Sequence, residues 1–267
     1  MSSLDTAASV LRLIARLERE TTVTEVAARL DLPKSSISRL LKHMGDAGLL
    51  ERDPATLSYR PSLLLLEVGR LAYHDAPLCD RMEAALRDLT QLTGHTGYIS
   101  VLEGSDVIVL RVSPGTHALR LVTFPGYRSP AWATSTGRAL LARLDDAAVA
   151  ERLAGVRYEL SSNAPRSLAE VLQRLARIRR ERVAVAVEET MEGTGSVSAA
   201  LLDPATRSAL ALCLSFPLRG RGEADAEVRR MAELITKKAE SVGRACGDPQ
   251  WSPQGALQDQ HEPDKVE

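Results

Sequence analysis

The most restrictive feature of this 267-residue sequence lies at residues 23–50, where two short amphipathic helices are separated by a tight turn. Thr24 is a candidate cap for the first helix, and Pro33 ends it, because proline is accepted only in the first turn of a helix. In the second helix the apolar residues recur at i, i+3, i+4 and i+7, the spacing of one helical face. These residues are Ile37, Leu40, Leu41 and Met44. The spacing predicts a helix-turn-helix.

The opposite side of the second helix carries hydrogen-bond donors and no acid. Its members are Lys34, Ser35, Ser36, Ser38, Arg39, Lys42 and His43. Arginine can bond guanine bidentately, serine suits a phosphate or a base edge, and lysine neutralises phosphate. The pattern therefore favours a helix that reads the major groove of DNA. The alternative is a three-helix bundle whose polar side is solvated and binds nothing.

The flanking segments favour the DNA-binding alternative. Residues 4–19 predict a third helix, and residues 48–60 read as strand, turn and strand, which together form a wing. From this wing Arg52 and Arg60 could reach a phosphate, and Thr24 at the start of the first helix is also a predicted DNA contact. The formal net charge of the chain is −1, and residues 1–75 hold ten basic and ten acidic side chains. Binding would then depend on local geometry and on avidity in a dimer more than on bulk charge.

With these features the sequence resembles the IclR-type transcription regulators over roughly residues 5–245. The similarity rests on Leu-Pro-Lys-Ser-Ser-Ile-Ser-Arg-Leu-Leu at 32–41, Gly-Leu-Leu-Glu-Arg-Asp at 48–53 and Ala-Thr-Ser-Thr-Gly-Arg-Ala-Leu-Leu-Ala at 133–142. It implies a winged helix-turn-helix, a linker helix and a GAF-like sensor domain that binds a small-molecule effector.

Beyond residue 76 the sequence mixes helices and strands without a strand-helix-strand rhythm, which predicts an α+β fold. We expect helices at 78–92, 134–143, 167–181 and 224–245, and strands at 96–102, 107–112, 119–124, 183–187, 197–202 and 209–216. The last 21 residues are rich in Asp, Pro, Gln and Glu and are expected to be disordered. The predicted divisions are 1–61 for the DNA-binding domain, 62–76 for the linker helix, 77–246 for the effector-binding domain and 247–267 for the tail.

Carried over by position, the resemblance also implies residues that line an effector cavity. They are Ala118, Leu121, Ser129, Trp132, Ser135, Thr136, Ala186, Thr194, Ser196, Cys213 and Ser215. Hydroxyls and main-chain amides near 135–137 could hold an anionic oxygen; the alternative is that these small residues only pack a helix on a sheet. Ala186-Val187 stand where the family has an acidic pair, and Trp132 where it has a histidine. Because of these departures the identity of the ligand cannot be transferred from the family, and an apolar or aromatic effector is conceivable.

No catalytic residue, metal ligand or cofactor is predicted. The segments at 135–138 and 193–196 lack the spacing of phosphate-binding loops, and Glu188 and Glu189, adjacent at a strand end, point to opposite faces. The five histidines form no i, i+4 pair and are expected at the surface or in loops. Cys213 lies in an apolar run and is expected to be a small buried residue. Neither a secretory nor a membrane-spanning segment is evident, which predicts a cytoplasmic protein.

Together these patterns predict a DNA-binding transcription regulator whose affinity for double-stranded operator DNA is modulated by a small molecule, acting as a homodimer or homotetramer. One alternative is an enzyme that acts on a small molecule in the C-terminal cavity and uses the winged helix as an interaction module. Another is a structural DNA-binding protein without a ligand. The sequence leaves open the effector, the operator, and whether the protein represses or activates.

Overall fold

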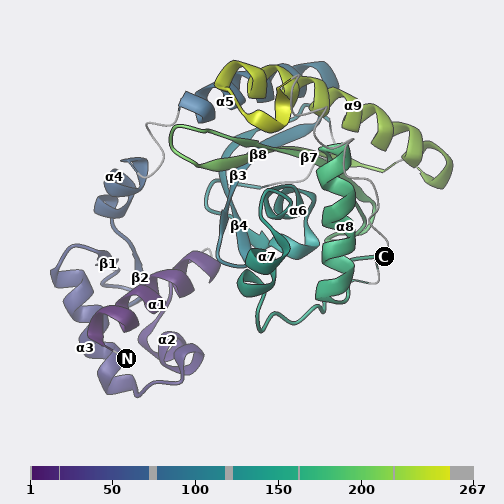
Figure 1. Cartoon of the computed structure of the whole chain (residues 1–267). Coiled ribbons are helices and arrows are strands. Elements are labelled where there is room, and N and C mark those ends of the chain that lie inside the picture. Colours follow the sequence, from purple (N-terminus) through teal and green to yellow (C-terminus); the bar gives the residue numbers. More distant parts are fainter. Residues whose placement is uncertain are drawn as a thin grey trace. The chain divides into compact units, whose positions relative to one another are not determined.

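The computed structural model describes residues 2–17, 19–71, 77–117, 123–161, 163–218 and 220–252 (Figure 1). The chain divides into two compact units, Met1–Asp75 and Ala76–Glu267. The first is mostly helical and the second combines an antiparallel sheet with helices. The prediction of an α+β protein with an N-terminal helix-turn-helix is thus confirmed. Within the described ranges, no helix is both long and apolar enough to cross a membrane.

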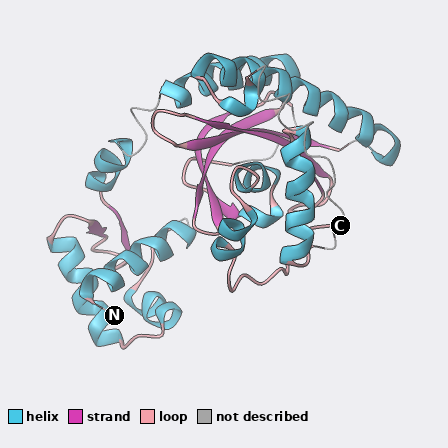
Figure 2. Cartoon of the chain, in the orientation of Figure 1, coloured by secondary structure: helices cyan, strands magenta, loops and turns pink. Residues whose placement is uncertain are grey.

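The N-terminal unit is a winged helix (Figure 2). Its elements are α1 (Ser3–Leu17), α2 (Val23–Leu30), α3 (Lys34–Asp46), β1 (Leu50–Arg52), β2 (Tyr59–Pro61) and α4 (Leu63–Leu71). Strands β1 and β2 form an antiparallel hairpin, and Thr21 pairs with Tyr59 as a further bridge. The three helices and the hairpin share one apolar core. This core consists of Val10, Ile14, Val26, Ala27, Ile37, Leu41, Met44, Leu50 and Tyr59.

The cap of α2 differs from the prediction. Thr22, not Thr24, lies at the N-cap in an extended conformation, and its hydroxyl accepts from the amide of Glu25 at 3.3 Å. Thr24 is an exposed residue of the first turn. At the other end Asp31 adopts a left-handed conformation with φ of 53°, and its amide bonds the carbonyl of Ala27. Aspartate tolerates this region better than most residues, so α2 ends at Leu30 with Asp31 as its C-cap.

The second unit is built on a six-stranded antiparallel sheet in the order β5-β4-β3-β8-β7-β6. The strands are β3 (Thr96–Glu103), β4 (Asp106–Ser113), β5 (Arg128–Pro130), β6 (Ala184–Val187), β7 (Thr194–Leu202) and β8 (Ala209–Pro217). The helices are α5 (Pro77–Thr93), α6 (Ser135–Leu141), α7 (Asp146–Arg152), α8 (Leu168–Glu181) and α9 (Gly220–Cys246), with short turns η1 (Ala131–Ala133) and η2 (Pro249–Trp251). Figure 1 shows α5 and α9 over one face of the sheet, and α6, α7 and α8 over the other.

The two faces of this sheet differ in residue type. Toward α5 and α9 the strands present large apolar side chains such as Ile99, Leu212 and Phe216. Toward α6 they present smaller ones, because alternate residues of β7 and β8 on that side are serine, alanine and cysteine. The short helix α6 is buried at every position, and the small residues beneath it allow this close approach.

Two parts of the prediction for this unit were incomplete or wrong. Strand β5 and helix α7 were not predicted, and most of the strand predicted at 119–124 lies outside the described residues. The predicted start of the disordered tail, residue 247, is too early in the sequence, because Asp248 and Trp251 are buried. Asp248 pairs with Arg143 at 2.8 Å, and the indole of Trp251 donates to the carbonyl of Ala200 at 3.0 Å. Residues 253–267 of the predicted tail are outside the described part of the chain.

Candidate DNA-binding face and effector site

Helix α3 presents an exposed polar face. Its seven predicted contact residues, 34–36, 38, 39, 42 and 43, are all exposed, while Ile37, Leu41 and Met44 are buried on the opposite side. Within the described residues, no ion pair engages the two lysines or the arginine of this face. Pro33 precedes the helix, and no side chain caps its first turn. The charges of α3 are therefore available to an external polyanion.

The wing brings further basic residues near this helix. A depression of about 630 Å³ lies between α3 and the hairpin, and its lining includes Ser38, Lys42 and Arg52. The guanidinium of Arg52 lies 5.7 Å from the ring centre of Tyr59. Arg60 is exposed but already paired with Glu51 at 2.9 Å, which raises the pKa of its guanidinium. A phosphate would have to displace Glu51 from Arg60, whereas Arg52 has no carboxylate partner in the described ranges.

In the second unit, the sheet register brings several of the predicted effector residues together. Ala186 pairs with Ser196, and Ser196 pairs with Ser215 on the next strand. Cys213 lies between Ser198 of β7 and Tyr98 of β3 in the same way. Because paired residues share a face, these side chains all point toward α6.

Helix α6 closes over this face through hydroxyl groups. Ser135 shares hydrogen bonds of 2.8 Å with both Ser196 and Ser198, and Thr136 one of 3.2 Å with Ser198. We call the group of Tyr98, Ser135, Thr136, Ser196, Ser198 and Cys213 the polar cluster. The amide of Gly137 donates to the hydroxyl of Thr134, the N-cap of α6, so that predicted main-chain donor is already used.

The polar cluster carries no charge at neutral pH. Burial raises the pKa of the Cys213 thiol, because the thiolate would be desolvated. Burial likewise raises the pKa of Tyr98 well above its ordinary value, and its proximity to Cys213 adds to the shift. Neutral hydroxyls both donate and accept, so these groups can bond one another, as they do here, or the polar oxygens of a ligand.

Other predicted effector residues are arranged differently. Trp132 is buried in η1, and its ring meets that of Tyr158 edge-on at 5.1 Å. Thr194 turns its hydroxyl to the carbonyl of Met191 at 2.6 Å. Ser129 lies in β5, at the far edge of the sheet from β6. Ala118 and Leu121 lie outside the described residues.

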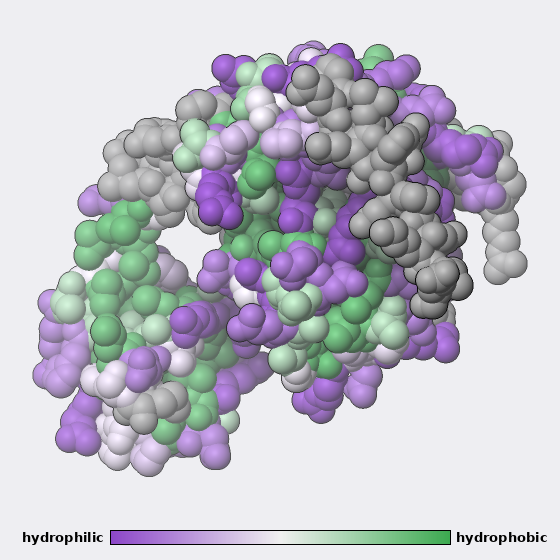
Figure 3. Space-filling model, in the orientation of Figure 1, coloured by the Kyte–Doolittle hydropathy of each residue, from purple (hydrophilic) through white to green (hydrophobic). Residues whose placement is uncertain are grey.

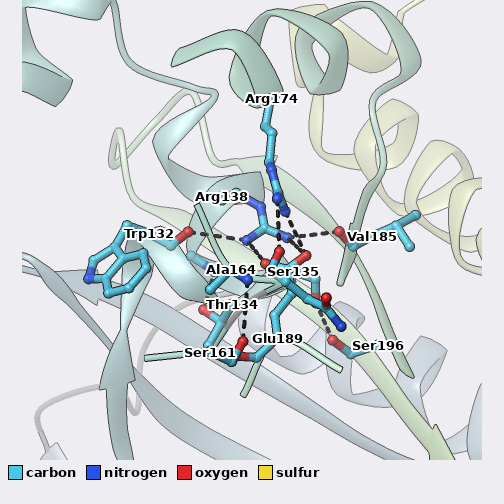
Figure 4. A network of polar contacts seen from close by, with 12 residues as sticks. Trp132, Thr134, Ser135, Arg138, Ser161, Ala164, Arg174, Val185, Glu189 and Ser196 are labelled. Atoms are coloured by element: carbon cyan, nitrogen blue, oxygen red, sulfur yellow. Dashed lines mark hydrogen bonds and ion pairs between the residues drawn. The ribbon is translucent and has the colours of Figure 1, made fainter. Parts of the chain in front are cut away.

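A buried ion pair that was not predicted lies at the centre of Figure 4. Arg138 of α6, with none of its surface exposed, donates to both oxygens of Glu189 at 2.6 and 2.9 Å. It also donates to the carbonyls of Trp132 and Val185. Arg174 of α8 reaches the same glutamate at 2.8 Å. In the sequence this pair is visible only as an arginine within a predicted helix and as two adjacent glutamates. Neither feature predicts that these side chains are buried.

His95 lies in the loop between α5 and β3, which agrees with the prediction that the histidines lie at the surface or in loops, but this loop residue is buried. Its imidazole stacks on His117 with ring centres 4.6 Å apart and lies 3.1 Å from a carboxylate oxygen of Glu227. Burial lowers the pKa of His95, an effect that its bond to Glu227 opposes. Across the described part of the chain, no three His, Cys, Asp or Glu side chains gather in a way that could hold a metal ion.

Comparison with known proteins agrees with both units. The sequence model for the IclR helix-turn-helix domain matches residues 3–54, and the one described as the bacterial transcriptional regulator IclR C-terminal matches residues 71–244. The HTH-type transcriptional regulator XynR of Escherichia coli is 27% identical over 252 residues, covering 93% of this chain and 98% of XynR.

Solved structures share the fold. An IclR transcriptional regulator from a Silicibacter species superposes with a TM-score of 0.78 at 20% identity, covering 92% of this chain and 97% of that one. An IclR homologue from Microbacterium hydrocarbonoxydans, solved in complex with 4-hydroxybenzoate, gives 0.68 at 19% identity, covering 90% and 100%. The families matched consist of transcription regulators and not of enzymes. The chain belongs to the IclR family of bacterial transcriptional regulators.

Proposed function

We propose that two copies of this chain bind a near-palindromic operator, each with α3 in the major groove, and that a small-molecule effector changes this binding. The observation that carries the proposal is the face of α3, which is exposed, basic and free of acids. A dimer would place its reading helices about 34 to 36 Å apart, one turn of DNA. In this proposal residues 1–61 read DNA, 62–76 link the units, 77–246 bind the effector, and the protein works in the cytoplasm.

Substituting Arg39 tests the role of α3. We expect Arg39→Ala to weaken binding to a genome-selected operator by about 1 to 3 kcal/mol, because a bidentate contact to a base would be lost. Titrations of labelled DNA at one fixed salt concentration measure this, since phosphate contacts alone change affinity strongly with salt. Arg180→Ala, which removes an exposed charge from α8, is the control and should leave the affinity unchanged. Equal affinity of the Arg39 variant and wild type would exclude this residue from the interface.

Helix α4 supplies a surface suited to a second copy. Four of its apolar side chains are exposed: Leu63 and Leu66 at 69%, Val68 at 59% and Leu64 at 41%. Figure 3 shows the apolar surface where α4 lies. A contiguous apolar surface of this kind generally marks an interaction site. Symmetric dimers bury the same patch from both copies, and a palindromic operator requires such symmetry.

We therefore expect Leu66→Glu to disrupt the dimer, because it would bring two like charges into an apolar interface. Sedimentation should show smaller species than wild type, and operator affinity should fall by at least about tenfold as avidity is lost. Glu67→Gln on the same helix is the matched control. If the Leu66 variant sediments as wild type does, α4 is not the interface. The same measurement on wild type separates a dimer from a tetramer.

The polar cluster, together with the predicted residue Trp132, is the proposed effector site. Neutral hydroxyls and an indole suit a small organic acid with an aromatic or apolar body, and one solved relative holds 4-hydroxybenzoate. The effector can shift operator binding only by its difference in affinity for two states of the protein. The test repeats the operator titration with a panel of small acids and aromatic compounds. A compound that changes wild-type affinity but not that of Ser196→Ala would support this site; an effect equal in both proteins would contradict it.

A further inference from the structure

A second cavity lies at the open edge of the sheet. Strand β6 is the last in the strand order, so no strand of the described residues pairs with its outer side. Residues of α8, α9 and β6, with Arg138 of α6, line an open cavity of about 450 Å³ at this edge, a size typical of small-molecule sites. Its described walls contain no residue of the polar cluster, so this cavity is separate from the proposed effector site.

The cavity has an excess of positive charge. Four arginines line it, Arg138, Arg174, Arg177 and Arg229, against two glutamates, Glu181 and Glu189. Arg177 and Glu181 neutralise each other on the exposed rim at 2.7 Å. Glu189, by contrast, is shared by Arg138 and Arg174, so this buried group keeps one positive charge. Arg229 is exposed and has no ion pair among the described residues, which adds a second.

The inner part of this charged group is buried. Glu189 is 4% exposed and Arg138 not at all, and the Nε of Arg138 is buried without a hydrogen-bond partner among the described residues. The charges without a carboxylate of their own are those of Arg174, whose side chain is 36% exposed, and of Arg229, which is exposed, so both can pair with an external anion. Guanidinium groups match the geometry of a carboxylate.

The remaining wall is apolar. It is formed by Val183, Val185 and Val187 of the edge strand, together with Ile178, Val228 and Ala232. An inorganic anion would leave these side chains in contact with water, whereas a hydrocarbon body would cover them. We propose that this cavity is a second ligand site, which takes a carboxylate with a hydrocarbon body.

The test is calorimetric titration of the full-length protein with octanoate, and with octanamide as the uncharged analogue. We expect octanoate to bind with one site per chain and octanamide to bind at least about tenfold more weakly, because it lacks the charge. Arg229→Gln should weaken octanoate at least about fivefold through loss of a charged hydrogen bond. Val187→Asp, which places a carboxylate on the exposed part of the wall, should weaken it further.

Controls separate this site from others. Arg180→Gln removes an arginine from α8 that does not line the cavity, and Ser196→Ala alters the polar cluster; octanoate affinity should stay within about twofold of wild type in both. Loss of binding in Ser196→Ala would assign octanoate to the effector site and overturn the proposal. Absence of binding at millimolar octanoate, equal affinity for octanamide, or unchanged binding in Arg229→Gln would also overturn it.

Discussion

Glu189→Ala is expected to reduce the free energy of unfolding of the C-terminal unit by about 3 to 5 kcal/mol. The substitution removes the carboxylate that both Arg138 and Arg174 bind. Among the described residues it leaves the buried Arg138 guanidinium with only the carbonyls of Trp132 and Val185 as acceptors. Burial already lowers the pKa of Arg138, since desolvation disfavours its charged form, and Glu189 is the main opposing influence. Without Glu189 the desolvation of the guanidinium is uncompensated.

Urea unfolding followed by tryptophan fluorescence measures this change in the relevant unit, because both tryptophans of the chain, Trp132 and Trp251, lie there. Glu181→Ala is the control, since its pair with Arg177 is exposed and should contribute no more than about 1 kcal/mol. The double variant Arg138→Met with Glu189→Leu should recover much of the loss, because well-packed apolar residues can replace a buried ion pair. If Glu189→Ala costs no more than Glu181→Ala, the buried pair does not stabilise the fold.

This pair also shows where inference from the sequence ends. The helix-turn-helix was predictable because its information is local: apolar residues at helical spacing, a proline at the turn, and a polar face opposite Ile37 and Leu41. The pairing of Arg138 with Glu189 spans 51 positions, and nothing near either residue shows that it becomes buried. Only the arrangement of α6 against the end of β6 decides that.

The end of the chain was misjudged for a related reason. Composition averaged over residues 247–267 is polar, and this average conceals Trp251. The indole packs where Gly243 has no side chain; a Cβ there would lie 2.5 Å from the Cγ of Trp251.

Contacts made through tertiary packing were also missed. A search for histidines spaced along one helix cannot find His95 stacked on His117, since the two rings meet only in the folded chain. In the polar cluster, the alternation of small residues along β7 and β8 indicated which of them share a face. The place of Tyr98 could not be predicted without knowing that β3 pairs with β8.

Gly137→Ala should destabilise the C-terminal unit by about 3 kcal/mol, although replacing glycine by alanine inside a helix ordinarily stabilises it by roughly 1 kcal/mol. A Cβ at this position would lie 2.1 Å from the carbonyl oxygen of Ala131 and 2.2 Å from its Cα, and both are backbone atoms. That backbone cannot easily move away, because the amide of Ala131 donates to the carbonyl of Ser105 at 2.9 Å and Arg138 donates to the carbonyl of Trp132.

Tryptophan fluorescence during urea unfolding again measures the change in stability. Gly69→Ala, in an exposed helix where no atom lies within 4 Å of the added methyl, should leave that transition unchanged. An unaltered or increased stability of Gly137→Ala would show that η1 can move away from α6, and the close approach that holds Ser135 and Thr136 against the sheet would then not depend on this glycine.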